Sequence, residues 1–442
     1  MVSTLGSPRT GAVDARSRAP FGWVPLVVLF IVGLVDRIEH NLLIGVLPAV
    51  QSEWGFSDTA AGSIPTAAAL AAAVVCLPAG YLADRLSRTR IIAVVVFVWA
   101  IATLGSGLAT GFLMFYVMRV LLAAAENIDN PASGSLLADY YPPVSRAKAY
   151  GLTRVTMHLG GVGTLLGGVL AEVFSWRTAF LVMVVPGALT ALLVWLLREP
   201  RRGELDRLVA SPASATSPPP LVKPPFWQQF KQVLAIPTLV LVCAGLSLLT
   251  LGMAGIFYWL PTLMVRTFGV GTGTAGSLSG IITVTGALTG TLAGSWLGRK
   301  WHGTRKGGRL LAGGSGITAG SLVLAGALSM ESIGALTALV LLSCSLIAIA
   351  TPNLTACLAD VVPAASRGLG FAVLQLLITG GGALGSLVVG IASDRLGSLL
   401  AGMYILVIPM VAGGLLTLKA RASFERDAHK VMEQAALDGR QA

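Results

Sequence analysis

Ionisable side chains occur inside long apolar stretches in the first half of the chain. Asp36 lies well inside an apolar stretch over 22–49, roughly 21 Å along a helix that starts there. Arg119 and Glu126 are two helical turns apart in the stretch 112–139 and therefore share one face. Burial favours the protonated form of a carboxyl group, whereas a nearby arginine favours the ionised form. Asp36 and Glu126 are therefore candidate proton carriers.

Arg119 is a candidate either to tune these carboxylates or to hold an anionic group of a substrate. Ion pairs that only lock helices together are the alternative, although a charge inside a membrane is functional by default. Glu39 and His40 are expected nearer the outer mouth and rank lower. The other candidate substrate-binding residues are Arg37, Asn130, Arg154, His158, Tyr258 and Trp259.

The elements that position these residues are membrane-spanning helices. Of 442 residues, 55% are hydrophobic and only 12% are charged, which is too little charge to cover a soluble protein of this size. The apolar stretches are continuous rather than alternating, which excludes a β-barrel. The expected fold is all-α, with twelve transmembrane helices near 22–49, 58–83, 90–109, 112–139, 146–172, 177–197, 236–265, 272–297, 309–328, 332–361, 366–391 and 398–419.

The spans divide into two six-helix bundles, over 22–197 and 236–419. Residues 1–21 and 420–442 are expected to be cytoplasmic tails. Residues 198–235 form a cytoplasmic linker whose SPASATSPPP segment is typical of extended chain. At its end, Trp227 and Phe230 beside Lys231 indicate a short interfacial helix.

The net charge of +11 is explained by membrane orientation. With both termini in the cytoplasm, the outer loops carry only Arg177, Arg266 and Arg395, and most other basic residues fall in inner loops, as the positive-inside rule requires. We therefore expect no nucleic-acid partner. The expected location is the plasma (inner) membrane, and the expected oligomeric state is a monomer.

Motifs for other chemistry do not occur in the sequence. There is no Walker loop, zinc-ligand spacing or nucleophile elbow, so we expect neither an enzyme nor a bound metal or cofactor. The cysteines, Cys76, Cys243, Cys344 and Cys357, fall in apolar segments and are interpreted as packing residues. The second half has almost no buried charge. Its apolar wall favours an amphipathic substrate over a sugar.

The loop after the second span reads GYLADRLSRTR over 80–90. It resembles the signature loop of the major facilitator superfamily, GxxxDRxGRR, with Ser87 in place of the inner glycine. Its charged residues could form a conformational latch, to which we assign Gly80, Asp84, Arg85 and Arg88. The counterpart in the second half, over 294–300, keeps an arginine but lacks the aspartate.

Within that superfamily the first half resembles the spinster-like transporters. The resemblance rests on Asp36-Arg37, on Arg119 followed by Glu126, and on the segments 137–142, 176–180 and 198–203. It implies proton-linked movement of lysophospholipids or sphingoid phosphates, with proton coupling by Asp36 and Glu126. The sequence departs from the family in having Ala123 and Ala125 where glycines are usual.

These observations predict a proton-coupled secondary transporter of lysophospholipids or related anionic amphipathic lipids, working by alternating access. Two alternatives remain. One is a drug or small-molecule efflux antiporter of the same fold, against which the buried arginines argue because they would repel cations. The other is a non-transporting membrane sensor or scaffold, which would have no need for carboxylates at the centre of the membrane.

Overall fold

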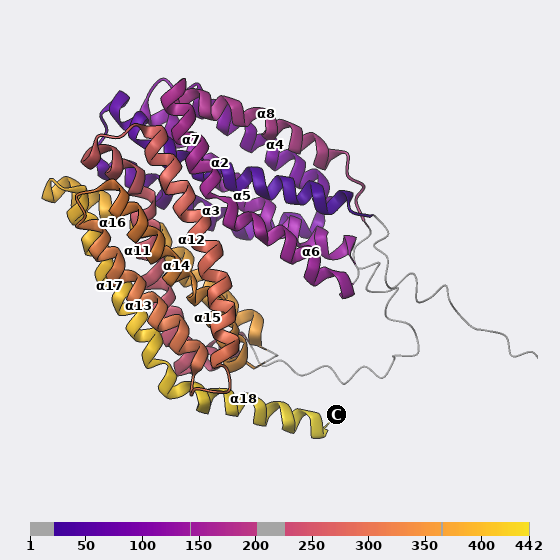
Figure 1. The fold of residues 1–442 in the computed structure, drawn as a ribbon. Coiled ribbons are helices and arrows are strands. Elements are labelled where there is room, and N and C mark those ends of the chain that lie inside the picture. The colour runs from indigo at the N-terminus through magenta and orange to yellow at the C-terminus, as the bar shows by residue number, and fades with distance from the viewer. Residues whose placement is uncertain (1–21, 142, 201–225, 364–365, 442) are drawn as a thin grey trace, which may run out of the picture.

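The computed structural model describes residues 22–141, 143–200, 226–363 and 366–441. Within these ranges, the side chains of 76–85, 127, 130–131, 143–144, 147, 226, 367–368 and 434–441 are outside the described part. The described residues contain helices and no strands. Figure 1 shows two groups of helices, one from each half of the chain.

Six spans from each half confirm the twelve-helix prediction. Those of the first half are α2 (Val24–Trp54), α3 (Asp58–Arg85), α4 (Arg88–Gly107), α5 (Phe112–Tyr140), the run α6 (Pro143–Val155), η1 (Thr156–Leu159) and α7 (Gly161–Val173), and α8 (Trp176–Trp195). Those of the second half are α11 (Pro237–Phe268), α12 (Thr272–Trp301), α13 (Gly308–Leu328), the pair α14 (Ile333–Ala348) and α15 (Ala350–Val361), α16 (Arg367–Leu396) and α17 (Leu399–Lys419). We call these groups the first bundle and the second bundle.

The fifth and tenth spans are interrupted rather than continuous. A single 3-10 turn, η1, separates α6 from α7, and one residue, Ile349, separates α14 from α15. Among the described helices, nine stretches are long and apolar enough to cross a membrane. They do not include α2 and α5, which carry the charges inside the first bundle, or the interrupted run from α6 to α7.

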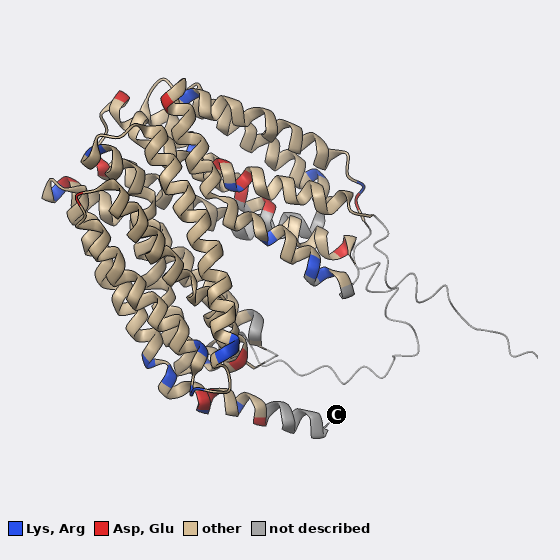
Figure 2. Cartoon of the chain, viewed as in Figure 1, with Lys and Arg blue, Asp and Glu red and all other residues tan. Residues whose placement is uncertain are grey.

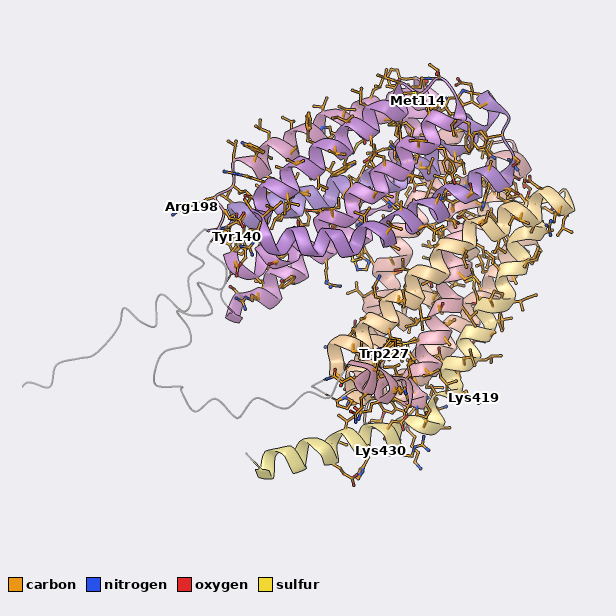
Figure 3. The ribbon with its side chains drawn as sticks, turned by 180° about the vertical axis from the view of Figure 1, so that it is seen from behind. Met114, Tyr140, Arg198, Trp227, Lys419 and Lys430 are labelled. Carbon is orange, nitrogen blue, oxygen red and sulfur yellow. The ribbon has the colours of Figure 1, made fainter. Side chains whose placement is uncertain are left out.

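Two helices flank the second bundle. The short helix predicted at the end of the linker is present as α10 (Phe226–Leu234). The segment predicted as a tail from residue 420 is instead helical, as α18 (Arg421–Gln441). The carboxylate of Asp427 in α18 accepts hydrogen bonds from the backbone N–H and the hydroxyl of Thr238, at 3.2 and 2.7 Å, which fixes α18 to the start of α11. Figure 3 shows Trp227 near Lys419 at this end of the second bundle.

The two bundles meet at one end and separate toward the other (Figures 1 and 3). The closed end is the one that holds Asp58, Arg266 and Asp394, and the open end is the one that holds Arg88 and Arg309. In the described part of the chain, every hydrogen bond between the bundles lies in the closed half.

Small residues allow the backbones of the two bundles to touch. A Cβ atom added to Gly161 of α7 would lie 2.5 Å from the carbonyl oxygen of Gly280 in α12. One added to Gly62 of α3 would lie 2.3 Å from the carbonyl oxygen of Ser386 in α16. Any larger residue would force the helices apart. The bundles therefore meet through two similar helix pairs, α7 with α12 and α3 with α16.

Candidate functional site

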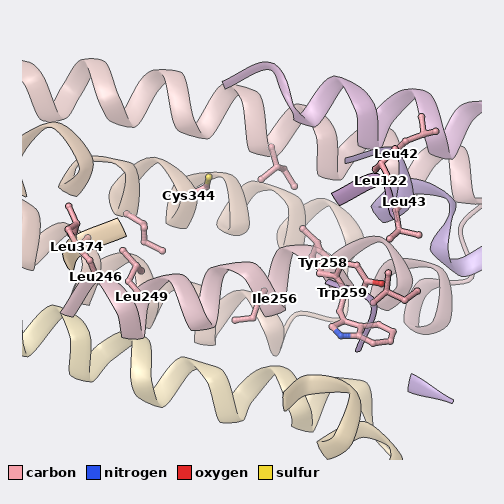
Figure 4. Packing of buried hydrophobic residues seen from close by; sticks show 14 of the residues in the cluster. Leu42, Leu43, Leu122, Leu246, Leu249, Ile256, Tyr258, Trp259, Cys344 and Leu374 are labelled. Atoms are coloured by element: carbon pink, nitrogen blue, oxygen red, sulfur yellow. The ribbon is translucent and has the colours of Figure 1, made fainter. Parts of the chain in front are cut away.

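A cavity of about 450 Å³ lies where the two bundles meet. Helices α3, α11 and α16 supply a mostly apolar wall, and α2 and α5 supply the charged groups. Figure 4 shows Leu43 and Leu122 of the first bundle on the side of Tyr258 in α11. The lining residues that carry the argument are His40, Arg119, Glu126, Phe257, Tyr258 and Ser386.

Arg119 forms a buried ion pair with Glu39. The guanidinium Nη2 lies 3.1 Å from Oε1 of Glu39, and the two side chains are 3% and 1% exposed. Nε and Nη2 of Arg119 both donate to the hydroxyl of Ser106, at 3.0 and 2.8 Å. The guanidinium also lies over the ring of Phe180, 4.7 Å from its centroid, a favourable cation–π contact.

Glu126 contacts His40 across the interface between α5 and α2. The imidazole Nδ1 of His40 lies 3.2 Å from Oε2 of Glu126, and His40 is the more exposed of the two side chains. The other carboxylate oxygen of Glu126 is buried and has no hydrogen-bond partner within the described part of the chain.

Asp36 lies next to this cavity region but not among the residues that line the cavity. Its carboxylate lies 3.2 Å from Nε of Arg37, and the two side chains are partly buried. Asp129 accepts a hydrogen bond of 2.6 Å from Ser133. The carboxylates of Asp36, Glu39 and Asp129 each interact electrostatically with that of Glu126, so α2 and α5 bring four carboxylates together. Figure 2 shows acidic and basic segments within the first bundle.

The other predicted substrate-binding residues are dispersed. Tyr258 lines the cavity, and its hydroxyl donates to the carbonyl of Ala61 at 2.9 Å, which joins the two bundles. Trp259 is fully buried and donates to the carbonyl of Ser386 within the second bundle. Arg154 is exposed and His158 is half-buried, and neither lines this cavity. The side chain of Asn130 lies outside the described residues.

The predicted latch is described only at Arg88, because the side chains of Gly80, Asp84 and Arg85 lie outside the described residues. Arg88 is 1% exposed and forms ion pairs with Asp139 of α5 and with Glu199 after α8. Both partners belong to the first bundle. In this conformation Arg88 therefore ties one bundle together and does not join the two.

Glu199 receives hydrogen bonds at the open end of the first bundle. Its partial burial acts to raise its pKa, but hydrogen bonds from the backbone and hydroxyl of Thr89 and from Arg88 outweigh this effect. The pKa of Glu199 is therefore held below its usual value. Nearby, the hydroxyl of Tyr140 donates to the carbonyl of Arg198 at 2.7 Å, and Figure 3 labels both residues at this end.

Sequence reasoning ranked Glu39 low and did not single out Thr103 or Ser106. The hydroxyl of Thr103 donates to Oε1 of Glu39 at 2.7 Å, on the same oxygen that Arg119 contacts. Two hydroxyl residues three positions apart in an otherwise apolar span were the available signal, because they share one helix face. The described residues contain no group of three or more His, Cys, Asp or Glu side chains placed to hold a metal. Cys243, Cys344 and Cys357 are buried free thiols, and the side chain of Cys76 is outside the described part.

The sequence matches the family model described as Major Facilitator Superfamily over residues 29–386. This match covers most of the chain. The chain belongs to the major facilitator superfamily. It is a multi-pass membrane protein of a family of transporters.

Known members of the superfamily resemble this chain at modest identity. A gallate transporter of Pseudomonas putida is 27% identical over 343 residues, covering 72% of this chain and 74% of the relative. Protein spinster of Drosophila melanogaster is 25% identical, covering 66% and 48%, and the human protein spinster homolog 1 is 24% identical, covering 55% and 46%. The alignments thus span about half the length of the spinster relatives.

Solved structures of the superfamily share the fold. A bacterial homolog to human lysosomal transporter spinster, inward-facing and unoccupied, superposes with a TM-score of 0.79 at 23% identity, covering 94% of this chain and 99% of that one. A D-xylose-proton symporter superposes with a TM-score of 0.69 at 16% identity, covering 90% and 97%. At these identities the superpositions establish the twelve-helix architecture.

Proposed function

We propose that this chain is a proton-coupled secondary transporter that moves lysophospholipids or related anionic amphiphiles across the plasma membrane by alternating access. The observation that carries the proposal is the cavity between the bundles, whose walls are apolar on one side and charged on the other. An amphiphile needs both surfaces: an apolar wall for its chain and charged partners for its head group.

The charged wall supplies candidates for proton uptake and for binding the head group. Glu126 lines the cavity and has one carboxylate oxygen without a hydrogen-bond partner, which suits it to take up a proton. Arg119 lines the same cavity and offers a cationic group to an anionic head group. Asp36, one helical turn from His40 on α2, is proposed as the second proton carrier.

The proposed membrane orientation places the open end in the cytoplasm together with both termini. Basic residues concentrate at that end of the helices, including Arg88, Arg299, Lys300 and Arg309, in agreement with the positive-inside rule. In this conformation the cavity would exchange substrate with the cytoplasmic side or with the inner leaflet, while the closed end blocks the outside.

A transporter of small carboxylates is the second candidate, and three proteins similar to this chain support it. They are a gallate transporter, a cis,cis-muconate transport protein and a hexuronate transporter. Gallate and muconate are carboxylates with flat, unsaturated bodies. A cavity of about 450 Å³ with mostly apolar walls would enclose such a molecule.

Cationic substrates are the third possibility to test. Arg119 repels a cation only weakly, because Glu39 neutralises its charge. Four carboxylates, Asp36, Glu39, Glu126 and Asp129, surround two arginines, Arg37 and Arg119. The charge balance alone therefore does not exclude a drug-type antiporter, whereas a sensor or scaffold would have no use for the cavity.

The test is a substrate panel in proteoliposomes with and without a pH gradient. The panel contains palmitoyl-lysophosphatidate, gallate and a lipophilic cation. The proposal predicts saturable transport of the lysolipid that accelerates when a gradient is imposed. Selective transport of gallate would establish the second candidate, and transport of the cation alone would overturn both.

Substitutions at the proposed carriers test the proton coupling. Asp36→Asn and Glu126→Gln should each abolish gradient-driven accumulation while exchange of substrate without a gradient continues. Glu53→Gln is the matched control, because Glu53 pairs with Arg177 at the exposed end of α2. Gradient-driven transport at the wild-type rate in both variants would contradict the assignment.

A further inference from the structure

Glu39 is a buried carboxylate that none of the proposed steps uses. It is 1% exposed, and its Oε1 accepts hydrogen bonds from Arg119 at 3.1 Å and from Thr103 at 2.7 Å. Its Oε2 is buried and has no hydrogen-bond partner within the described residues. The ionised form of Glu39 is thus stabilised through one oxygen only.

Arg119, the partner of Glu39, lines the cavity, whereas Glu39 does not. Its Nη1 makes no hydrogen bond in the described part of the chain, whereas Nε and Nη2 are occupied by Ser106 and Glu39. The guanidinium can therefore still donate from Nη1, but its charge is already compensated by Glu39. An anion entering the cavity meets a neutral pair rather than a free cation.

Few other charges act on this pair. From α5, Arg119 is the direct partner of Glu39 and Glu126 lies farther away. From α4 and α8 the neighbours are hydroxyl groups and the ring of Phe180, which carry no charge. On α2 itself, Asp36, Arg37 and His40 flank Glu39 in sequence. If Arg119 turned to another anion, Glu39 would have no second cation in contact.

We propose that Glu39 is an internal counter-anion, which occupies Arg119 in the empty transporter and is displaced by the anionic group of the substrate. The carboxylate of Glu39 takes up one proton as it loses the guanidinium, because an unpaired carboxylate cannot stay ionised in a dry interior. The balance is one anionic group and one proton entering together, so that the charge inside the membrane does not change. Glu39 thereby couples substrate charge to proton uptake.

This inference rests on the proposed function in one respect, the anionic nature of the substrate. Its first test uses the wild-type protein in weakly buffered detergent solution at pH 7. Palmitoyl-lysophosphatidate is added, and proton uptake is followed with an indicator dye while the Kd is measured calorimetrically. Binding with uptake of about one proton per ligand is expected. Binding with no uptake would overturn the inference without any variant.

The second test assigns the proton to Glu39. Glu39→Gln keeps an acceptor for Thr103 but cannot neutralise Arg119, so it should bind lysophosphatidate about tenfold more tightly and take up about one proton fewer per ligand. Monopalmitoylglycerol, which lacks the anionic group, should bind both proteins equally. Unchanged affinity and proton uptake in Glu39→Gln would contradict the role of Glu39.

Failure of the inference and failure of the proposed function give different results. If the wild type binds no anionic amphiphile, the proposed function fails. If the wild type binds it and Glu39→Gln behaves identically, only the inference fails. Glu53→Gln should match the wild type in both measurements. If Glu39→Gln does not fold, the inference is still contradicted by wild-type binding without proton uptake, or by the absence of a new carboxylic-acid band in the infrared difference spectrum on binding.

Discussion

At the scale of the residue, two contacts between ionisable side chains join α2 to α5. Arg119 and Glu39 join α5 to α2, and His40 and Glu126 join the same helices again. Breaking one partner of a buried pair leaves the other charge uncompensated, which costs more than the pair contributes. Substitutions at the two residues of one pair should therefore have non-additive effects on the free energy of unfolding.

A double-mutant cycle on Arg119 and Glu39 tests this view. Arg119→Leu alone should lower the free energy of unfolding by about 3–5 kcal/mol, because it leaves the Glu39 carboxylate unpaired. Adding Glu39→Leu should recover most of that loss. The measurement is denaturant unfolding in detergent micelles. The same cycle on the exposed pair Arg177 and Glu53 should give a coupling energy of about 1 kcal/mol or less. Additive effects at Arg119 and Glu39 would show that they do not act as a unit.

At the scale of the element, the contact between α7 and α12 depends on glycine. Gly161 and Gly280 approach so closely that neither position has room for a methyl group. Where two helices touch through small residues, they can separate without large side chains having to leave one packing site and enter another. The pair is therefore suited to an interface that must open and close.

Gly280→Ala should weaken the closed end. Its new methyl group would overlap the carbonyl of Gly161 at 2.3 Å, so the population with the closed end open should rise. Distances between spin labels at Ser52→Cys and Leu396→Cys, both exposed near the closed end, measure this. Gly326→Ala is the control, since nothing lies within 4 Å of a Cβ atom there. Equal distance distributions in both variants would argue against the role of the glycine contact.

The segment after α8 is fixed to α4 by Glu199, and this contact predicts a pH dependence. Because the pKa of Glu199 is lower in the folded protein than in the unfolded chain, its contribution is present at neutral pH and is lost as the pH falls through its folded pKa. Glu199→Gln should lower stability at pH 7 by about 1–2 kcal/mol, and the difference from wild type should shrink below about pH 4. Thermal unfolding in detergent at the two pH values measures it; a difference that grows in acid would have the wrong sign.

At the scale of the whole molecule, a polar cluster holds the closed end together. Asp58 at the start of α3 accepts hydrogen bonds from both terminal nitrogens of Arg266 in α11, at 2.8 and 2.7 Å, and from the hydroxyl of Ser393 in α16. Asp394 in turn accepts from the backbone N–H groups of Asp58 and Thr59. The cluster joins the bundles on the side opposite to Arg88.

Asp58→Asn should therefore shift the conformational equilibrium toward states in which the closed end has opened. Loss of the ionised acceptor removes about 1–3 kcal/mol of interaction, which corresponds to a change of roughly 5- to 150-fold in the ratio of the two states. The spin-label pair at Ser52→Cys and Leu396→Cys reports the change. Glu53→Gln, which breaks an ion pair within one bundle, should leave the distribution as in the wild type.

Much of the architecture was predictable because hydrophobic length alone defines a membrane span. The interruptions at η1 and between α14 and α15 were not predicted. Pro352, at the third position of α15, marks the second one, because proline has no N–H to donate to the carbonyl of Ala348, whereas no proline lies at η1. The helix α18 was missed because its sequence from Arg421 onward is polar, and its attachment depends on contacts with residues distant in sequence, such as those of Asp427 with Thr238 and of Glu425 with Gly307.

The candidate site was predictable in its residue types but not in its pairing. Arg119 and Glu126 share a helix face, yet each finds its partner on α2, at Glu39 and His40. Helical periodicity tells which side chains share a face of one helix. It does not tell how a neighbouring helix is rotated against that face, and this rotation decides which charges meet.

The charged residues that line the cavity, Arg119 and Glu126, both belong to the first bundle, which has a consequence for how new transporters could arise. The cavity wall supplied by α11 and α16, with residues such as Ala254, Phe257 and Ala383, bears no charge. Exchanging those side chains would change the space available to the substrate and leave the carboxylates of α2 and α5 unchanged. Relatives with different cargoes could thus diverge through steric changes in one half of the molecule, and chimaeras that swap second bundles should inherit the selectivity of the donor.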